Sequence, residues 1–115
     1  MLDTAPQLGT RGSRRLRGEY AMTKENMTST EIHDDTIIVY RSMTAPPGQG
    51  GEIINVTQPY RCLVPKDAEG LLVAGRCFSS DLIANNRFNL IPHCIAMGQG
   101  AGTGAAIAIK DNVAP

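Results

Sequence analysis

The stretch Pro92-His93-Cys94-Ile95-Ala96-Met97-Gly98-Gln99-Gly100-Ala101-Gly102-Thr103-Gly104-Ala105-Ala106 decides the fold of this chain. Proline is favoured in the first turn of a helix, because its missing N–H leaves no intrahelical bond unmade there. A helix is therefore predicted over Pro92–Lys110. Each of its four glycines costs about 1 kcal/mol relative to alanine. A small domain bears such a cost only where larger side chains are excluded.

The glycines form two smooth faces on this helix, because Gly98 and Gly102 lie four residues apart, as do Gly100 and Gly104. Two interpretations are open. In the first, the glycines only allow close packing against a strand or another helix. In the second, the amino end of the helix also bears on an anionic or electron-rich ligand, since its free N–H groups and the helix dipole converge there.

A short apolar run, Gly70-Leu71-Leu72-Val73-Ala74-Gly75-Arg76, precedes the predicted helix. A continuous apolar run of this length is typical of a strand buried on both faces of a parallel sheet, so a strand is predicted over Leu71–Ala74. It ends at Gly75, where the backbone can approach another group closely. A loop is expected from Cys77 to Leu90, and the helix is expected to pack along the strand.

Three further strands are predicted in the middle of the chain, where β-branched and aromatic residues gather. They run over Thr36–Tyr40, Glu52–Thr57 and Tyr60–Val64. The proline- and glycine-rich stretch from residue 45 to residue 51 fits no regular element and joins the first two. Strands on both sides of such a loop favour an antiparallel β-ribbon.

The composition excludes several classes of protein. The 115 residues fit one small domain. Eleven basic and eleven acidic residues give no net charge, so neither nucleic acid nor an anionic membrane is an expected partner. The uncharged stretch from Cys94 to Ile109 is shorter than the roughly 20 residues of a membrane span. No apolar signal-peptide core is found in the first 18 residues, and a cytoplasmic location is expected.

The cysteines are three in number, Cys62, Cys77 and Cys94, and no two are spaced as C-x-x-C. An odd count without that spacing indicates neither a disulfide framework nor a zinc site. Reduced thiols are expected, and no metal site is predicted.

Four stretches of the sequence stand out in order. The first is Gly9–Tyr20, in which the paired arginines Arg14 and Arg15 come before Gly18-Glu19-Tyr20, and it is followed by Tyr60–Lys66, Leu71–Cys77 and Pro92–Ala106. Together they resemble the carboxyl-terminal end of the FAD-dependent oxidoreductases related in fold to the fumarate reductase flavoproteins. The resemblance is weakest from Asn26 to Thr57.

The resemblance implies an α/β fold in two parts. Residues 61–115 would supply the terminal strand and the glycine-rich helix of an FAD/NAD(P)-binding Rossmann-like domain. Residues 1–60 would supply a partial substrate-side or cap segment with the β-ribbon. The expected function is that of the carboxyl-terminal portion, or a subunit, of a flavin-dependent oxidoreductase acting on a small-molecule substrate.

The resemblance also implies FAD as the cofactor, with the start of the helix under the isoalloxazine ring. Backbone N–H groups there would stabilise negative charge at the N1/O2 edge of the reduced flavin. The cofactor-binding residues would be Gly75, Arg76, Asp81, Ile91, Pro92, His93, Cys94 and Gly98.

Several of these side chains have a second interpretation. Arg87 would hold a substrate carboxylate or be a solvated loop residue. Arg14, with Arg11 and Arg15, would line an anionic substrate site, remain solvated at the surface or form an internal ion pair with Glu19. Asp81 would contact a cofactor hydroxyl or cap a turn. His93 would donate a proton or be structural.

One feature of such flavoproteins is absent from the sequence: a strand followed by G-x-G-x-x-G and, about 20 residues on, an acidic residue. The expected partner is therefore a protein segment or subunit that carries this fingerprint. A homo-oligomer is a further expectation, because unpaired strand edges and an apolar helix favour association. The alternative function is a non-catalytic interaction domain that keeps the motifs without binding FAD.

Overall fold

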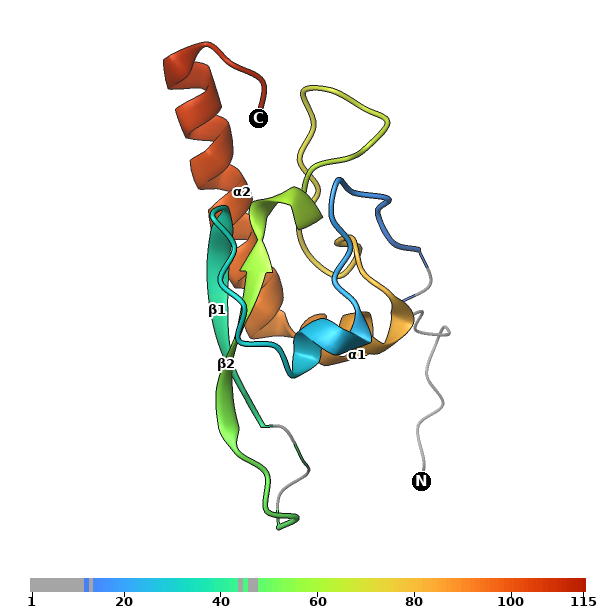
Figure 1. Ribbon diagram of the computed structural model, residues 1–115. Helices are drawn as coiled ribbons and strands as arrows, with labels where there is room; N and C mark the ends of the chain where they lie inside the picture. The colour runs from blue at the N-terminus through green and yellow to red at the C-terminus, as the bar shows by residue number, and fades with distance from the viewer. Residues whose placement is uncertain (1–11, 13, 44, 46–47) are drawn as a thin grey trace, which may run out of the picture.

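The computed structural model describes residues 12, 14–43, 45 and 48–115. It is a small α/β structure in which the long helix α2 lies beside a two-stranded ribbon of β1 and β2 (Figure 1). Gly9, Thr10 and Arg11, which belong to the stretch with the paired arginines, lie outside the described residues. The elements, in chain order, are the 3-10 helix η1 (Lys24–Met27), β1 (Thr36–Met43), β2 (Ile53–Pro59), the 3-10 helix η2 (Tyr60–Cys62), α1 (Leu82–Phe88) and α2 (Ile91–Asp111).

The ribbon confirms the first two predicted strands and their antiparallel pairing. Tyr40 lies opposite Val56, and Met43 lies opposite Ile53 at the end where the strands are joined. Ile38 and Tyr40 are buried, whereas Val39 between them is exposed, so one face of β1 packs against the core. The joined end of the ribbon projects beyond the helices (Figure 1).

The third predicted strand, Tyr60–Val64, is wrong, because the chain turns into η2 at this point. Pro59 ends β2 and has no N–H to extend the ladder. The Tyr60 N–H donates to the carbonyl oxygen of Asp35 at 2.7 Å. The carboxylate of Asp35 also accepts from the backbone N–H of Arg61 at 3.0 Å and from its Nε at 2.9 Å. These bonds hold a turn in place of a strand.

The predicted strand Leu71–Ala74 is also wrong, since these residues are irregular and Leu71 is half exposed. A parallel strand needs hydrogen-bonding neighbours, and in the described ranges only β1 and β2 pair as named strands. The Val73 N–H donates instead to the carbonyl oxygen of Leu63. In the described part of the chain the sheet is a two-stranded antiparallel ribbon, and the parallel Rossmann arrangement stays a prediction.

The predicted loop from Cys77 to Leu90 contains a helix, α1. The side chain of Asp81 caps it by accepting from the Ala84 N–H at 2.7 Å. Ala84 and Phe88 lie on the buried face of this helix. The helix has only two turns, so it depends on tertiary packing for stability. The Asp81 cap and the packing of Ala84 and Phe88 against the core provide it.

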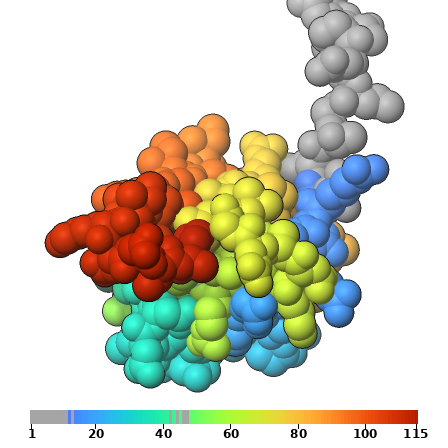
Figure 2. Space-filling model, turned by 90° about the horizontal axis from the view of Figure 1, so that it is seen from above, coloured from blue at the N-terminus to red at the C-terminus, as the bar shows by residue number. Residues whose placement is uncertain are grey.

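The long predicted helix is confirmed as α2, which ends where Asn112 adopts a left-handed conformation with φ of 54°. It packs against β1. At its carboxyl end the chain turns back, so that Ala114 and Pro115 lie beside the segment 64–71 (Figure 2).

The two glycine faces of α2 have different surroundings. A Cβ on Gly100 would lie 2.9 Å from Cδ1 of Ile37, and a Cβ on Gly104 would lie 2.6 Å from Cε2 of Tyr60. A Cβ on Gly98 or Gly102 would meet nothing within 4 Å. Close packing is therefore the reason for Gly100 and Gly104, whereas the face of Gly98 and Gly102 is open.

Candidate functional site

The candidate site is the start of α2 together with the turn at residues 75–77, which α1 links to it. Asn85 and Asn89 are fully buried between these segments. The side-chain amide of Asn85 donates to the carbonyl oxygen of Arg76 at 2.9 Å, and that of Asn89 donates to Oδ1 of Asn85 at 3.2 Å. The two asparagines therefore fix the turn at Arg76 relative to the first residues of α2.

The amino end of α2 has no side-chain cap. Leu90 occupies the capping position without a side-chain hydrogen bond, and Pro92 lies in the first turn, which contains no acidic residue. Backbone N–H groups of this turn have no partner within the helix, so they remain available to an acceptor. The end of the helix is also apolar, since Leu90, Ile91 and Ile95 are exposed.

His93 in the first turn is held by aromatic rings. Its ring centroid lies 4.4 Å from that of Tyr40 and 5.5 Å from that of Phe88, in edge-to-face contacts. Burial, together with the nearby charge of Arg87, lowers the pKa of His93. Its Nδ1 is buried without a partner among the described residues. These contacts fix the ring and favour its neutral form.

Tyr40 anchors the aromatic cluster in the core. Its hydroxyl donates to Oε1 of the fully buried Gln58. Burial raises the pKa of Tyr40 far above its ordinary value, and the thiols Cys62 and Cys94 add to this effect. Tyr40 therefore remains protonated, as a structural support for the start of α2.

Gly75 and Arg76 lie in the turn before α1 and not at the end of a strand. Gly75 has a φ of 97°, a left-handed conformation that glycine adopts without strain, and its carbonyl accepts from the Phe78 N–H. Arg76 and Cys77 are exposed. The thiol of Cys94 donates to the carbonyl oxygen of Asn89 at 3.6 Å, which places it on the same asparagine pair.

Asp81 is a helix cap, which is one of its two predicted roles. One carboxylate oxygen accepts from the Ala84 N–H, and the other accepts from the Lys24 N–H at 2.7 Å. The carboxylate thus joins α1 to η1. A contact with a cofactor hydroxyl stays a prediction.

The two arginines predicted to bind substrate are exposed and lie on different segments. Arg87 is in the last turn of α1, and its Nη2 donates to the carbonyl oxygen of Met43 at 3.4 Å. Arg14 lies in an irregular segment. The side chain of the next residue, Arg15, donates to the carbonyl oxygens of Gly12 and Ser80. Their roles toward a substrate stay predictions.

The sequence interpretation missed Asn85, Asn89, Tyr40 and Gln58. The asparagines are in a segment that was predicted to be a loop, where polar residues are ordinary. Their sequence signal is the capped helical pattern of Asp81, Ala84 and Phe88, which places Asn85 on the buried side of a helix. Burial of Gln58 has no comparable signal, because it depends on the packing of β2.

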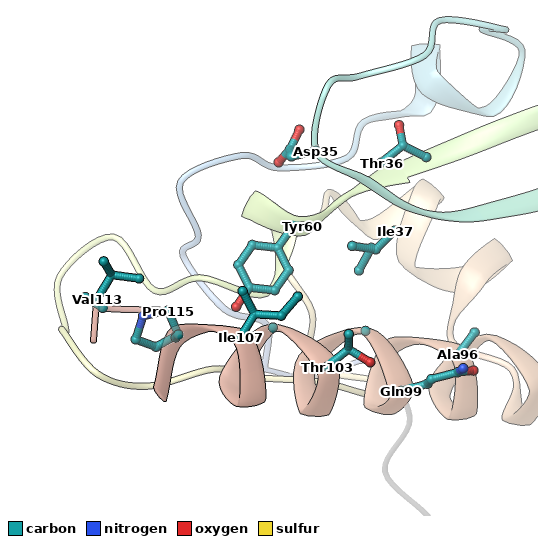
Figure 3. Close-up of a pocket in the computed structure, with 14 residues that line it drawn as sticks. Asp35, Thr36, Ile37, Tyr60, Ala96, Gln99, Thr103, Ile107, Val113 and Pro115 are labelled. Atoms are coloured by element: carbon teal, nitrogen blue, oxygen red, sulfur yellow. The ribbon is translucent and has the colours of Figure 1, made fainter. Parts of the chain in front are cut away.

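A cavity of about 570 Å³ lies away from this site, along the middle and carboxyl-terminal half of α2 (Figure 3). Its walls are the start of β1, the ring of Tyr60 and the returning chain end at residues 113–115. The hydroxyl of Tyr60 is buried there without a partner among the described residues. None of the ten residues predicted for the site lines this cavity.

A model of the family described as FAD dependent oxidoreductase matches residues 1–115 of the chain. The chain belongs to that family. Its cofactor is FAD, and the members are oxidoreductases. No curated protein and no solved structure matches this flavoprotein sequence. The finer relation to the fumarate reductase flavoproteins stays a prediction.

The residues at the start of α2 fit one end of FAD. An uncapped helix start without an acidic side chain can donate backbone hydrogen bonds to an electron-rich acceptor such as the N1/O2 edge of a flavin. The exposed side chains of Leu90 and Ile91 can make apolar contacts with a flavin ring. The sequence has no strand followed by G-x-G-x-x-G, so contacts with the pyrophosphate and adenosine are not supplied by that fingerprint here.

Among the described residues, no helix has both the length and the apolar character needed to cross a membrane.

Proposed function

We propose that this chain supplies the flavin-facing helix start of an FAD-dependent oxidoreductase, with α2 directed at the isoalloxazine ring. The observation that carries the proposal is the uncapped, acid-free and apolar amino end of α2, in a chain that the family matches from end to end. The bound flavin supplies the transfer of a hydride or of electrons to and from the substrate.

The backbone N–H groups of Ile91 and His93 would donate to the N1/O2 edge of the flavin. Their alignment with the helix dipole makes these bonds stronger when that edge carries negative charge, as it does in the reduced state. Pro92 has no N–H to donate, but it fixes the direction of the first turn. Leu90 and Ile91 would exclude water from the ring.

The turn before α1 would lie beside the same cofactor. Asn85 and Asn89 brace this turn against the helix start, so Gly75 and Arg76 would hold fixed positions relative to the ring. Arg76 would place a positive charge near the flavin. Gly98, further along α2, would allow close approach by the cofactor or by the protein segment that binds its other end.

Arg87 and Arg14 would bind an anionic group of a small-molecule substrate. A guanidinium group pairs with a carboxylate through two parallel hydrogen bonds, which orients the substrate as well as binding it. His93 would donate a proton during turnover, because burial and the charge of Arg87 lower its pKa and so make the protonated ring a stronger acid.

A second protein segment or subunit with the G-x-G-x-x-G fingerprint would hold the adenosine end of FAD. The open face of α2 supports such a partner, because Ile95, Gly98 and Gly102 are exposed along it. The alternative is a non-catalytic interaction domain, which would use the same face without a flavin.

The experiment is co-expression with a neighbouring reading frame that encodes the fingerprint, followed by absorbance spectroscopy of the purified complex. A yellow complex is expected, and Ile91→Asp should lower its flavin content about tenfold, because a carboxylate at the helix start repels the electron-rich flavin edge at a cost of about 1.4 kcal/mol. The matched control is Ile109→Asp, at another exposed isoleucine of α2. A colourless complex, or equal flavin loss in both variants, would contradict the proposal.

A further inference from the structure

His93 and Tyr40 meet where the start of α2 lies against the core. Their ring centroids are 4.4 Å apart with 61° between the ring planes, and the ring of Phe88 lies 5.5 Å from that of His93 at 73°. Tyr40 and Phe88 are both buried, whereas His93 is half-buried. The inner side of the imidazole therefore faces aromatic rings.

The two ring nitrogens of His93 have different surroundings. Nδ1 is buried and has no hydrogen-bond partner among the described residues. Since the residue as a whole is half-buried, the part of the ring that reaches the surface is the side that carries Nε2. A neutral imidazole has one N–H and one nitrogen lone pair, so one of the two must occupy the buried position.

A lone pair on Nδ1 would have no donor within reach in the described part of the chain. The hydroxyl proton of Tyr40 is donated to Oε1 of Gln58. The amide nitrogen of Gln58 is itself buried without a partner there, so it does not reach Nδ1. Phe88 has no polar hydrogen to donate. A lone pair directed at the electron-rich face of an aromatic ring is also repelled.

An N–H on Nδ1 fits the same surroundings better. Its hydrogen is the positive end of the bond, and the face of an aromatic ring attracts such a hydrogen. This arrangement also avoids leaving an acceptor unpaired in the core, which costs more than a weak contact returns. The neighbouring rings therefore favour the tautomer of His93 that has its proton on Nδ1.

Tyr40 is the nearer of the two rings, and other parts of the fold hold it in place. It stacks on Phe88 of α1, with the ring centroids 4.9 Å apart and 19° between the planes. Its hydroxyl donates to Gln58, which is fully buried on β2. Contacts with the β-ribbon and with α1 thus set the orientation of the ring that His93 meets.

We propose that Tyr40 is a positioning residue that holds neutral His93 in the tautomer with its proton on Nδ1, so that Nε2 exchanges protons at the start of α2. The partner of one imidazole nitrogen decides what the other nitrogen can do. On protonation Nε2 gains an N–H and the ring becomes a cation; release of that proton restores the same tautomer. The role of Nε2 in turnover rests on the proposed function, whereas the tautomer depends only on contacts within this chain.

The test is nitrogen NMR of the chain with isotope-labelled histidine and without flavin. The sequence has two histidines, His33 and His93, and His33→Gln identifies the signals of each. At about pH 8 the His93 ring is neutral, because burial and the charge of Arg87 hold its pKa below the ordinary value. Protonated and bare imidazole nitrogens have separate resonances. We expect a protonated Nδ1 and a bare Nε2 in His93.

The matched variants replace one buried ring at a time. Tyr40→Leu removes the nearer ring and should lower the ratio of the Nδ1–H to the Nε2–H tautomer about fivefold, equivalent to about 1 kcal/mol. Phe88→Leu removes the ring at 5.5 Å and should have a smaller effect. Tyr40→Phe keeps the ring and should keep the tautomer, although it loses the hydrogen bond to Gln58. A purely structural role of Tyr40 would lower stability without this order of tautomer ratios.

A bare Nδ1 in the unchanged chain would overturn the proposal, and so would a His93 spectrum in native buffer that matches the spectrum in urea. A folded Tyr40→Leu with an unchanged tautomer ratio would contradict the role of Tyr40. If that variant does not fold, Phe88→Leu decides, because a fivefold loss there would contradict the same role. A colourless flavin complex would contradict the proposed function alone, so the two failures are distinguishable.

Discussion

Replacing the helical glycines of α2 one at a time by alanine separates close packing from helix propensity. At Gly102 a Cβ would meet nothing within 4 Å, so alanine should raise the free energy of unfolding by about 1 kcal/mol, its ordinary advantage in a helix. At Gly104 the same Cβ would lie 2.6 Å from Cε2 and 2.7 Å from Cζ of Tyr60. Overpacking of this kind costs about 1–3 kcal/mol.

The net effect of Gly104→Ala is therefore a loss of about 0–2 kcal/mol, because the helix gain offsets part of the clash. The backbone N–H of Tyr60 is bonded to Asp35, which limits how far the ring can move away. Gly100→Ala should fall between the two variants, since its closest contact, at 2.9 Å, is with the terminal Cδ1 of Ile37. The order of stability should be Gly102→Ala first, then Gly100→Ala, then Gly104→Ala.

The assay is urea unfolding followed by circular dichroism, with all variants at one protein concentration. The informative quantity is the difference between Gly102→Ala and Gly104→Ala, about 1–3 kcal/mol, because the helix-propensity gain cancels between them. Gly98→Ala is the control, since its Cβ also meets open space. Equal stability of the Gly102 and Gly104 variants would refute the packing explanation of this helix face.

Three further predictions concern stability and association. Asp81→Ala should cost about 1 kcal/mol through loss of the α1 cap, and Asp81→Asn should cost less; equal unfolding midpoints for both would contradict this role. Burial raises the pKa of Asp35, but hydrogen bonds and the charge of Arg61 outweigh this effect and hold the pKa below its ordinary value. The stability that the Asp35–Arg61 pair contributes is therefore present above the pKa of the unfolded state and is lost as the pH falls through the folded pKa. In Asp35→Asn, the free energy of unfolding should decrease less as the pH falls. An unchanged decrease would contradict the role of the Asp35–Arg61 pair. Sedimentation of the isolated chain at micromolar concentration should show an oligomer or a poorly stable species, whereas a single 12.3 kDa species with a cooperative, high-temperature transition would oppose the expected dependence on a partner.

The sequence alone determined the elements whose signals are local. Pro92 in the first turn predicted α2, and the β-branched residues of Thr36–Tyr40 predicted β1 with its antiparallel partner. Helix starts and β-ribbons depend on residues near one another in the chain, so their signals can be read in order along it. The family motifs likewise predicted the FAD-dependent oxidoreductase family that matches the chain.

Only the tertiary structure decided what the apolar run Leu71–Ala74 becomes, because an apolar run forms a strand only where hydrogen-bonding neighbours lie beside it. It also decided which glycines of α2 are packed. In the sequence the pairs Gly98/Gly102 and Gly100/Gly104 are equivalent, and the ring of Tyr60 against Gly104 distinguishes them. Burial of Asn85 had the same origin, since its amide finds the Arg76 carbonyl only after α1 folds against that turn. Contacts between residues distant in the chain carry no local signal, so these outcomes follow from packing.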